Sequence, residues 1–239
     1  VEQPADKILA LVQAYKEDPR DQKIDLGVGV YKNAEGITPV MRAVKTAEHQ
    51  LWQQETTKSY VGLLGDPRFS DVMVDLVLGD AVPRASVAAA ATPGGTGAVR
   101  QAFELIKMAH PEARIFVSDP TWPNHLSILK FLGMPVMPYR YFDGETRGVD
   151  FEAMLQDLSA AKPGDVILLH GCCHNPTGAD IDFSAWQTIT ELSQKNGYIY
   201  EHRFVAHEKY GDLLPDCELC GKECSWELYT THIDHVDED

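Results

Sequence analysis

The chain has 239 residues, of which 44% are hydrophobic, enough to bury the core of one large α/β domain or of one domain with an appendage. Its formal net charge of −15 argues against a protein that neutralises the phosphates of nucleic acid or of anionic lipid. An odd number of cysteines, five, and the lack of a secretory leader favour a reducing, cytoplasmic setting, and no apolar run reaches membrane-span length.

Helical patterns dominate the first third of the chain. A helix is predicted to open at residues 4–6 and to end at Asp18-Pro19. Pro39 and Pro67 are expected in the first turns of two further amphipathic helices, because proline is tolerated where the backbone N–H has no helical partner. Residues 25–31 are apolar but interrupted by glycine, which indicates a docking strand or a loop.

From residue 88 onward, short β-rich runs alternate with helical patterns. We predict strands at 88–91, 115–117, 136–141 and 166–169, and helices at 95–109, 123–131, 151–161 and 183–195. This alternation predicts an α/β fold, with a mostly parallel sheet covered by helices on both faces. Ligands of such folds bind beyond the carboxyl ends of the strands.

A glycine-rich turn, TPGGTGA at 92–98, follows the first of these strands and opens a helix. Glycines let the backbone approach an anion, and the helix start offers free N–H groups, so the turn is a candidate phosphate cup. An ordinary structural turn is an equally good interpretation of the glycines alone. The spacing matches neither the Walker pattern nor the dinucleotide-binding GxGxxG.

Further motifs stand beside the cup in a fixed order: DLGVGVYK at 25–32, TKSY at 57–60, SDPTWPNH at 118–125 and HGCCHNPTG at 170–178. With them, residues 3–197 resemble a class I, fold-type I aminotransferase that uses pyridoxal 5′-phosphate (PLP), most of all the aspartate and aromatic amino-acid aminotransferases. The resemblance implies the PLP-binding large domain of that fold, incomplete at its C-terminal side. It also implies amino-group transfer between an aspartate or aromatic amino acid and a 2-oxo acid.

The resemblance assigns four residues to the cofactor. Gly95 and Thr96 would hold its phosphate, and Trp122 would stack on the pyridine ring. Asn175 would hydrogen-bond the ring hydroxyl and, with Trp122, help to bind the substrate. From composition alone, a buried core position would be the better assignment for Trp122.

Three further residues have supporting roles by the same resemblance. Gly29 would lie over the substrate, in a segment that closes on binding. Tyr60 would reach the cofactor phosphate of a partner subunit, which implies a homodimer. His125 would support the acid that pairs with the pyridine nitrogen.

Two catalytic groups of the family have no counterpart in this sequence. The aspartate that pairs with the pyridine nitrogen should follow Gly197 by a few residues, where Arg203 stands with the opposite charge. Lys209 and Lys222 lack the context of the Schiff-base lysine, so we assign no catalytic residue. We therefore expect a truncated enzyme without turnover, and a non-catalytic fusion or truncation remnant is the alternative.

Residues 198–239 form a separate, acidic tail with eleven acidic and three basic residues. It resembles a truncated HNH endonuclease, since a Cys217-x-x-Cys220 knuckle precedes an Asp234-His235 pair. By that resemblance the cysteines would form half of a zinc site, while Asp234 would hold a divalent metal such as Mg²⁺ and His235 would activate water. A disordered acidic tail is the simpler interpretation, and we prefer it to a working nuclease.

Overall fold

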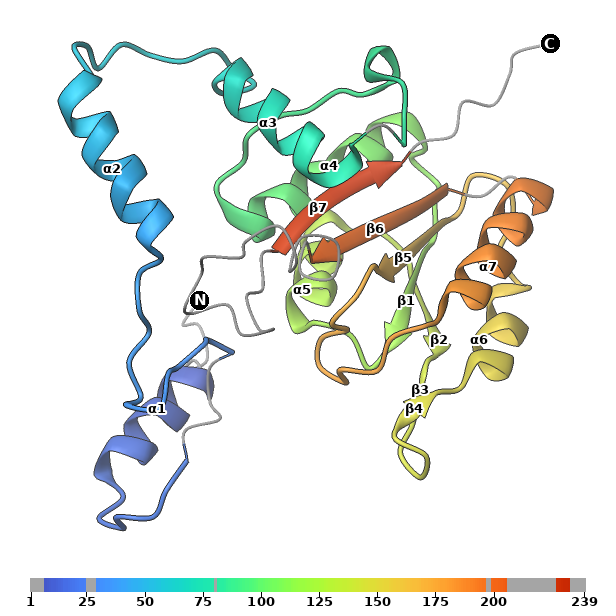
Figure 1. Ribbon diagram of the computed structural model, residues 1–239. Helices are drawn as coiled ribbons and strands as arrows, with labels where there is room; N and C mark the ends of the chain where they lie inside the picture. Colours follow the sequence, from blue (N-terminus) through green and yellow to red (C-terminus); the bar gives the residue numbers. More distant parts are fainter. Residues whose placement is uncertain (1–6, 25–28, 80, 197–198, 206–226, 233–239) are drawn as a thin grey trace. The chain divides into compact units, whose positions relative to one another are not determined.

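The computed structural model describes residues 7–24, 29–79, 81–196, 199–205 and 227–232 (Figure 1). The described chain falls into two compact units, which we treat separately. The first holds the described residues up to Thr57, and the second holds those from Lys58 onward.

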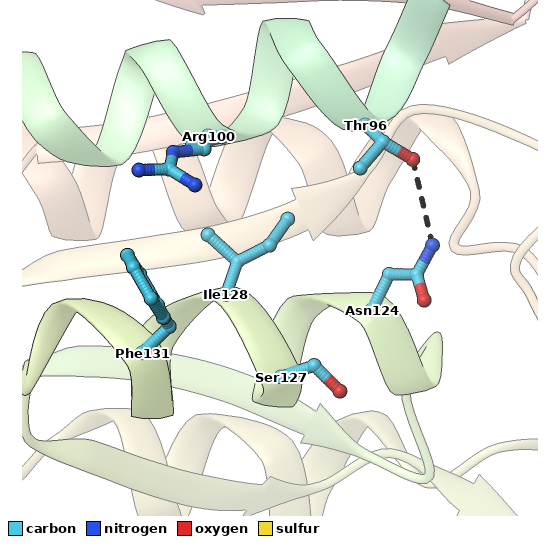
Figure 2. A pocket seen from close by; sticks show the side chains of 6 residues that line it. All are labelled: Thr96, Arg100, Asn124, Ser127, Ile128 and Phe131. Carbon is cyan, nitrogen blue, oxygen red and sulfur yellow. Dashed lines mark hydrogen bonds between the residues drawn. The ribbon is translucent and has the colours of Figure 1, made fainter. Parts of the chain in front are cut away.

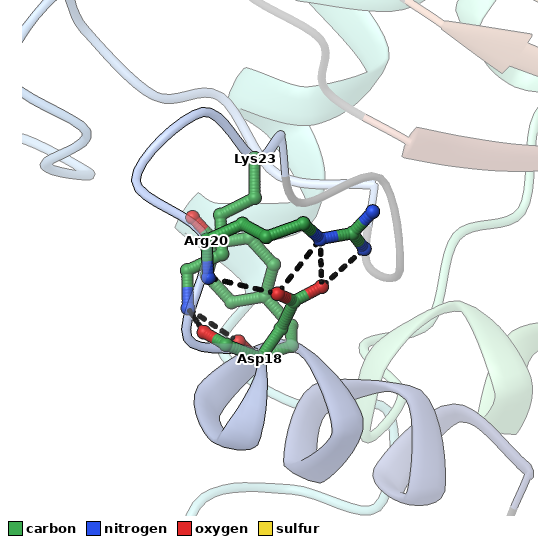
Figure 3. A network of polar contacts seen from close by, with 4 residues as sticks. Asp18, Arg20 and Lys23 are labelled. Atoms are coloured by element: carbon green, nitrogen blue, oxygen red, sulfur yellow. Dashed lines mark hydrogen bonds and ion pairs between the residues drawn. The ribbon is translucent and has the colours of Figure 1, made fainter.

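The first unit contains α1 (Lys7–Glu17) and α2 (Arg42–Gln54). Lys23 folds back on the end of α1, where its Nζ donates to the main-chain oxygens of Tyr15 (2.7 Å) and Asp18 (2.6 Å) (Figure 3). A cation is stabilised there because the carbonyls at a helix C-terminus carry partial negative charge. The prediction for Pro39 was wrong, since α2 begins at Arg42, and the resulting helix buries none of its side chains.

The second unit holds all the strands and the remaining helices. In chain order these are α3 (Pro67–Leu78), the short 3₁₀ helix η1 (Arg84–Ser86), α4 (Gly94–Ala109), β1 (Ile115–Asp119), α5 (Pro123–Leu132), β2 (Val136–Arg140), β3 (Phe142–Asp143), β4 (Gly148–Val149), α6 (Phe151–Leu158), β5 (Val166–His170), α7 (Phe183–Asn196), β6 (Ile199–Val205) and β7 (Glu227–His232). The predicted helices from residue 95 onward are confirmed, and Pro67 does occupy the first turn of α3.

One predicted strand is absent. Residues 88–91 belong to no helix or strand, and Ala91 N–H donates instead to the main-chain oxygen of Leu64 (2.9 Å). Alanines at 88–91 offer little side-chain surface to pack against a neighbouring strand, which weakens a sheet position that the apolar pattern alone favours.

The main sheet has five strands in the order β2-β1-β5-β6-β7, and β3 and β4 form a separate antiparallel pair. The first four strands are parallel, as predicted, while β7 pairs with β6 antiparallel. Parallel pairing brings the carboxyl ends of β1 and β5 to the same edge of the sheet.

Two clusters of buried apolar side chains cover the sheet, one on each face. Along β1 and β5, successive side chains alternate between the layers, so that Ile115 and Val166 enter one and Phe116 and Ile167 the other. Helices α4 and α5 complete the first layer, and α6 and α7 the second. The sheet is therefore packed on both faces where its loops begin.

Candidate functional site

The candidate site is built from three chain segments at the carboxyl edge of the sheet. They are the start of α4, the loop from β1 into α5, and the loop that follows β5. The motifs at 92–98, 118–125 and 170–178 supply these segments, so the structure gathers them where an α/β sheet places its ligands.

The first segment has the backbone of an anion cup. Gly94 has φ +70°, a conformation that side chains rarely adopt, and a Cβ on Gly97 would lie 2.9 Å from Pro93 Cδ. No side chain caps α4. Gly94 N–H donates to the Thr92 oxygen (2.8 Å), and the N–H groups that follow it in the first turn have no partner within the helix. This donor set, with the Thr96 hydroxyl beside it, fits a phosphate group.

A hydrogen bond connects the cup to the second segment. Asn124 Nδ2 donates to Thr96 Oγ1 at 3.4 Å, which joins the first turns of α4 and α5 (Figure 2). An open groove of about 220 Å³ begins at this pair and continues between the two helices to Phe131. The Arg100 guanidinium lies over the Phe131 ring, 4.8 Å from its centroid, at the far end of the groove.

The second segment places Trp122 and His125 side by side. Trp122 is half-buried immediately before α5, with its indole edge-on to the imidazole of His125 (centroids 5.2 Å apart, 89° between planes). His125 is fully buried, and its Nδ1 lies 2.9 Å from Thr121 Oγ1. The Trp122 ring is thus held in orientation by a buried neighbour.

Hydrogen bonds continue from His125 to the third segment. Thr121 Oγ1 also lies 3.4 Å from His170 Nε2, and the N–H of Asn175 donates to His170 Nδ1 at 3.3 Å. Because His170 Nδ1 accepts, a neutral His170 carries its proton on Nε2 and donates to Thr121. The Thr121 hydroxyl is then free to donate to His125 Nδ1, which leaves the proton of a neutral His125 on Nε2.

A second imidazole stabilises the loop around Asn175. Both ring nitrogens of the buried His174 lie 2.9 Å from a hydroxyl, Nε2 from Ser118 and Nδ1 from Thr177. Its ring is stacked between those of Tyr141 and His170, with both centroid distances 4.1 Å. Burial and the nearby Asp180 carboxylate raise the pKa of Tyr141, whose hydroxyl stays protonated and donates to the Ala179 oxygen (2.7 Å).

The structure thus brings together four of the predicted residues, Thr96, Trp122, His125 and Asn175, by the contacts above, and Gly95 lies in the first turn of α4. Tyr60 is fully exposed in the second unit. Gly29 belongs to the first unit, so its predicted place over the substrate stays a prediction.

Sequence reasoning missed Thr121, His170 and Asn124. Thr121 and His125 are four residues apart, a spacing at which side chains meet in helical turns, and this signal could have revealed their contact. Nothing in the spacing of residues 121 and 170 predicts that they meet, because their contact depends on the pairing of β1 with β5.

The pairing of β5 with β6 places residue 203 at the same edge of the sheet. His170 is the register partner of Arg203, so the main chain there lies beside the site. The predicted tail residues Cys217, Cys220, Asp234 and His235 lie outside the described residues. Among the residues that the structure does describe, no cluster of histidine, cysteine or carboxylate side chains could hold a metal ion. The described helices are too short or too polar to cross a membrane.

The sequence profile of the family "Aminotransferase class I and II" matches residues 21–201. The aromatic-amino-acid aminotransferase of Paracoccus denitrificans is 56% identical over 214 residues, 90% of this chain and 54% of that protein. The aspartate aminotransferase of Haemophilus influenzae is 45% identical over 82% of this chain and 50% of that protein. The chain therefore spans about half the length of these relatives.

Solved structures agree with the sequence relatives. An aromatic amino acid aminotransferase with 3-indolebutyric acid has 57% identity and a TM-score of 0.81, covering 84% of this chain and 51% of that one. The aromatic-amino-acid aminotransferase of Burkholderia pseudomallei, covalently bound to pyridoxal phosphate, has 35% identity and a TM-score of 0.80 over 84% of this chain and 51% of that one.

Proposed function

The chain belongs to the class I and II aminotransferase family, and from this premise we propose that it carries the cofactor-holding part of a PLP-dependent aminotransferase. The reaction would move an amino group between an amino acid and a 2-oxo acid. The observation that carries the proposal is the joining of the anion cup, Trp122 and Asn175 at one edge of the sheet.

Each residue near the cup would hold a different part of the cofactor. The first turn of α4, with Gly95 and Thr96, would bind the phosphate. Trp122 would cover one face of the ring, and Asn175 would hydrogen-bond its hydroxyl. When bound, the cofactor supplies an electron sink for charge that develops at the substrate's α-carbon.

The chain of hydrogen bonds from Asn175 to His125 would determine which ring nitrogen of His170 and of His125 carries a proton. With His170 donating to Thr121 and Thr121 donating to His125, the Nε2 proton of His125 is set by its neighbours. His125 would then present an N–H, supporting a hydrogen-bond acceptor beside the pyridine nitrogen.

We further propose that the 239 residues printed here do not complete a transamination cycle. By the family resemblance, Arg203 stands at about the spacing where the pairing aspartate is expected, and a basic residue type would not keep the pyridine nitrogen protonated. The aminotransferases named above include both aspartate and aromatic enzymes, so the proposed substrates are an aspartate or aromatic amino acid with a 2-oxo acid.

The proposal also covers the oligomeric state, the cellular compartment and the C-terminal tail. In a homodimer, the exposed Tyr60 would reach the cofactor phosphate of the partner subunit. Gly29 would cover the substrate. We propose a cytoplasmic location for the protein. We infer that the change in sequence character at residues 197–198 lies within the sheet, and that no independent HNH nuclease follows it. The pairing of β6 and β7 beside β5 favours a continuation of the aminotransferase sheet over a separate metal domain.

Calorimetric titration with pyridoxamine 5′-phosphate tests the proposed site, because this cofactor form lacks the aldehyde that reacts with surface lysines. We expect the chain to bind it, and Thr96→Val and Asn175→Ala each to weaken binding on the order of tenfold, the usual effect of one lost polar contact. Ser127→Ala is the control, since Ser127 lines the groove but donates only to the Pro123 oxygen. Failure of the chain to bind, or equal binding by Asn175→Ala, would contradict the proposal.

A further inference from the structure

The loop from β5 to α7 turns sharply just before Asn175. Cys173 has φ +51°, the left-handed conformation that non-glycine residues seldom adopt. In this turn the N–H groups of Cys173 and His174 point to the same side, where both donate to the Asp180 carboxylate. The two distances are 2.8 Å to Oδ2 and 2.9 Å to Oδ1.

We propose that Asp180 is a positioning residue that sets the direction in which Asn175 meets the cofactor. The inference rests on the proposed function. Asp180 does not touch the cup residues by any contact described above. Asp180 accepts from the N–H groups of the two residues before Asn175. Together with the bond from Asn175 N–H to His170, it sets how Asn175 leaves the turn.

A carboxylate suits this position for a chemical reason. Two successive N–H groups in a turn that contains a left-handed residue form a concave anion site, and a carboxylate offers an oxygen to each without a donor of its own. Hydrogen bonds to a charged acceptor are also stronger than neutral ones. An asparagine would satisfy one N–H and turn its own amide donors toward the other.

Other groups hold the rest of the loop. His174 is fixed by Ser118 and Thr177 through its side chain, and Ala179 by the hydroxyl of Tyr141. None of these contacts restrains the N–H groups of Cys173 and His174. The effect of losing the carboxylate should therefore be local to the turn and to Asn175.

Asp180→Asn tests the inference, with Asp182→Asn as the matched control. Asp182 loses the same charge, but it accepts from Ala185 N–H (2.8 Å) and Ser184 Oγ (2.7 Å) at the start of α7. We expect Asp180→Asn to weaken pyridoxamine-phosphate binding on the order of tenfold and Asp182→Asn to leave it unchanged. Hydrogen exchange at the Cys173 and His174 amides should accelerate in Asp180→Asn alone.

A double-mutant cycle decides whether Asp180 acts through Asn175. In an Asn175→Ala background, Asp180→Asn should have no further effect on affinity. Additive losses would overturn the inference, as would unchanged binding by Asp180→Asn when the unmodified chain binds. Asp180→Glu keeps both acceptor oxygens and should recover part of the affinity, which a mere loss of folding would not allow. If the unmodified chain does not bind, the proposed function fails first and this inference with it.

Discussion

At the scale of single residues, one buried carboxylate, that of Asp165, links the start of β1 to the loop before β5. Asp165 accepts from Arg114 Nε (3.1 Å) and from the N–H of Lys162 (2.7 Å), and it also pairs with Arg114 Nη2. Burial alone would raise the pKa of Asp165, but the hydrogen bonds from Arg114 and Lys162 together outweigh it and hold the pKa below its usual range.

We expect Asp165→Asn to lower the free energy of unfolding by about 1–3 kcal/mol, because the buried Asp165 carboxylate is the charged acceptor of several hydrogen bonds. A group whose folded-state pKa is lowered stabilises the fold above its unfolded-state pKa and ceases to do so as pH falls through the folded value. The difference in unfolding free energy between the two proteins, measured by urea denaturation, should therefore shrink in acid. Asp143→Asn, at the end of β3, is the control: Asp143 accepts only from Glu145 and Thr146, both exposed, so its loss should cost less. A gap that widened in acid would contradict this assignment.

At the scale of elements, α5 stops at Gly133 because its backbone turns left-handed there (φ 66°, ψ 28°). A Cβ on Gly133 would meet no atom within 4 Å, so Gly133→Ala changes only the backbone energy. We expect a loss of about 1 kcal/mol in unfolding free energy. Gly144→Ala also enters open space, but without a left-handed backbone, and denaturant titration should show little effect. Equal effects of the two variants would contradict the explanation.

The elements show where sequence reasoning succeeds and where it stops. Helices α4 and α7 follow from their apolar spacing and from glycine near their ends, which are local signals. The failed strand at 88–91 has the right apolar pattern, but pairing depends on partners distant in sequence. The same limit applies to the site: motifs revealed Thr96 and Asn175, whereas the contact of Thr121 with His170 arises from strand order.

At the scale of the whole molecule, exposed apolar side chains favour association between molecules, whereas the large negative charge opposes it. Tyr60, Val61, Leu63 and Leu64 are all exposed in one short segment of the second unit. Apolar surface of this kind favours self-association, while the net charge of −15 opposes it. Added salt should therefore promote association, because it screens the repulsion but not the apolar contact.

Sedimentation velocity at rising protein and NaCl concentration measures this balance. We expect the weight-average sedimentation coefficient to increase with both, and to fall on the double substitution Leu63→Ser, Leu64→Ser. Phe183→Ser removes an equally exposed apolar side chain at the start of α7 and should not lower it. A single monomeric species that salt leaves unchanged would contradict the prediction.

The strand order also determines how this sheet grows during synthesis. On the ribosome, β1 meets β2 almost at once, but its other neighbour, β5, emerges only after β3, β4 and α6. Until then, one edge of β1 presents unpaired N–H and C=O groups. Phe116 also remains uncovered until the helices that pack against it have been synthesised. During that interval the nascent chain is exposed to wrong pairing at a strand that later leads into its candidate ligand site.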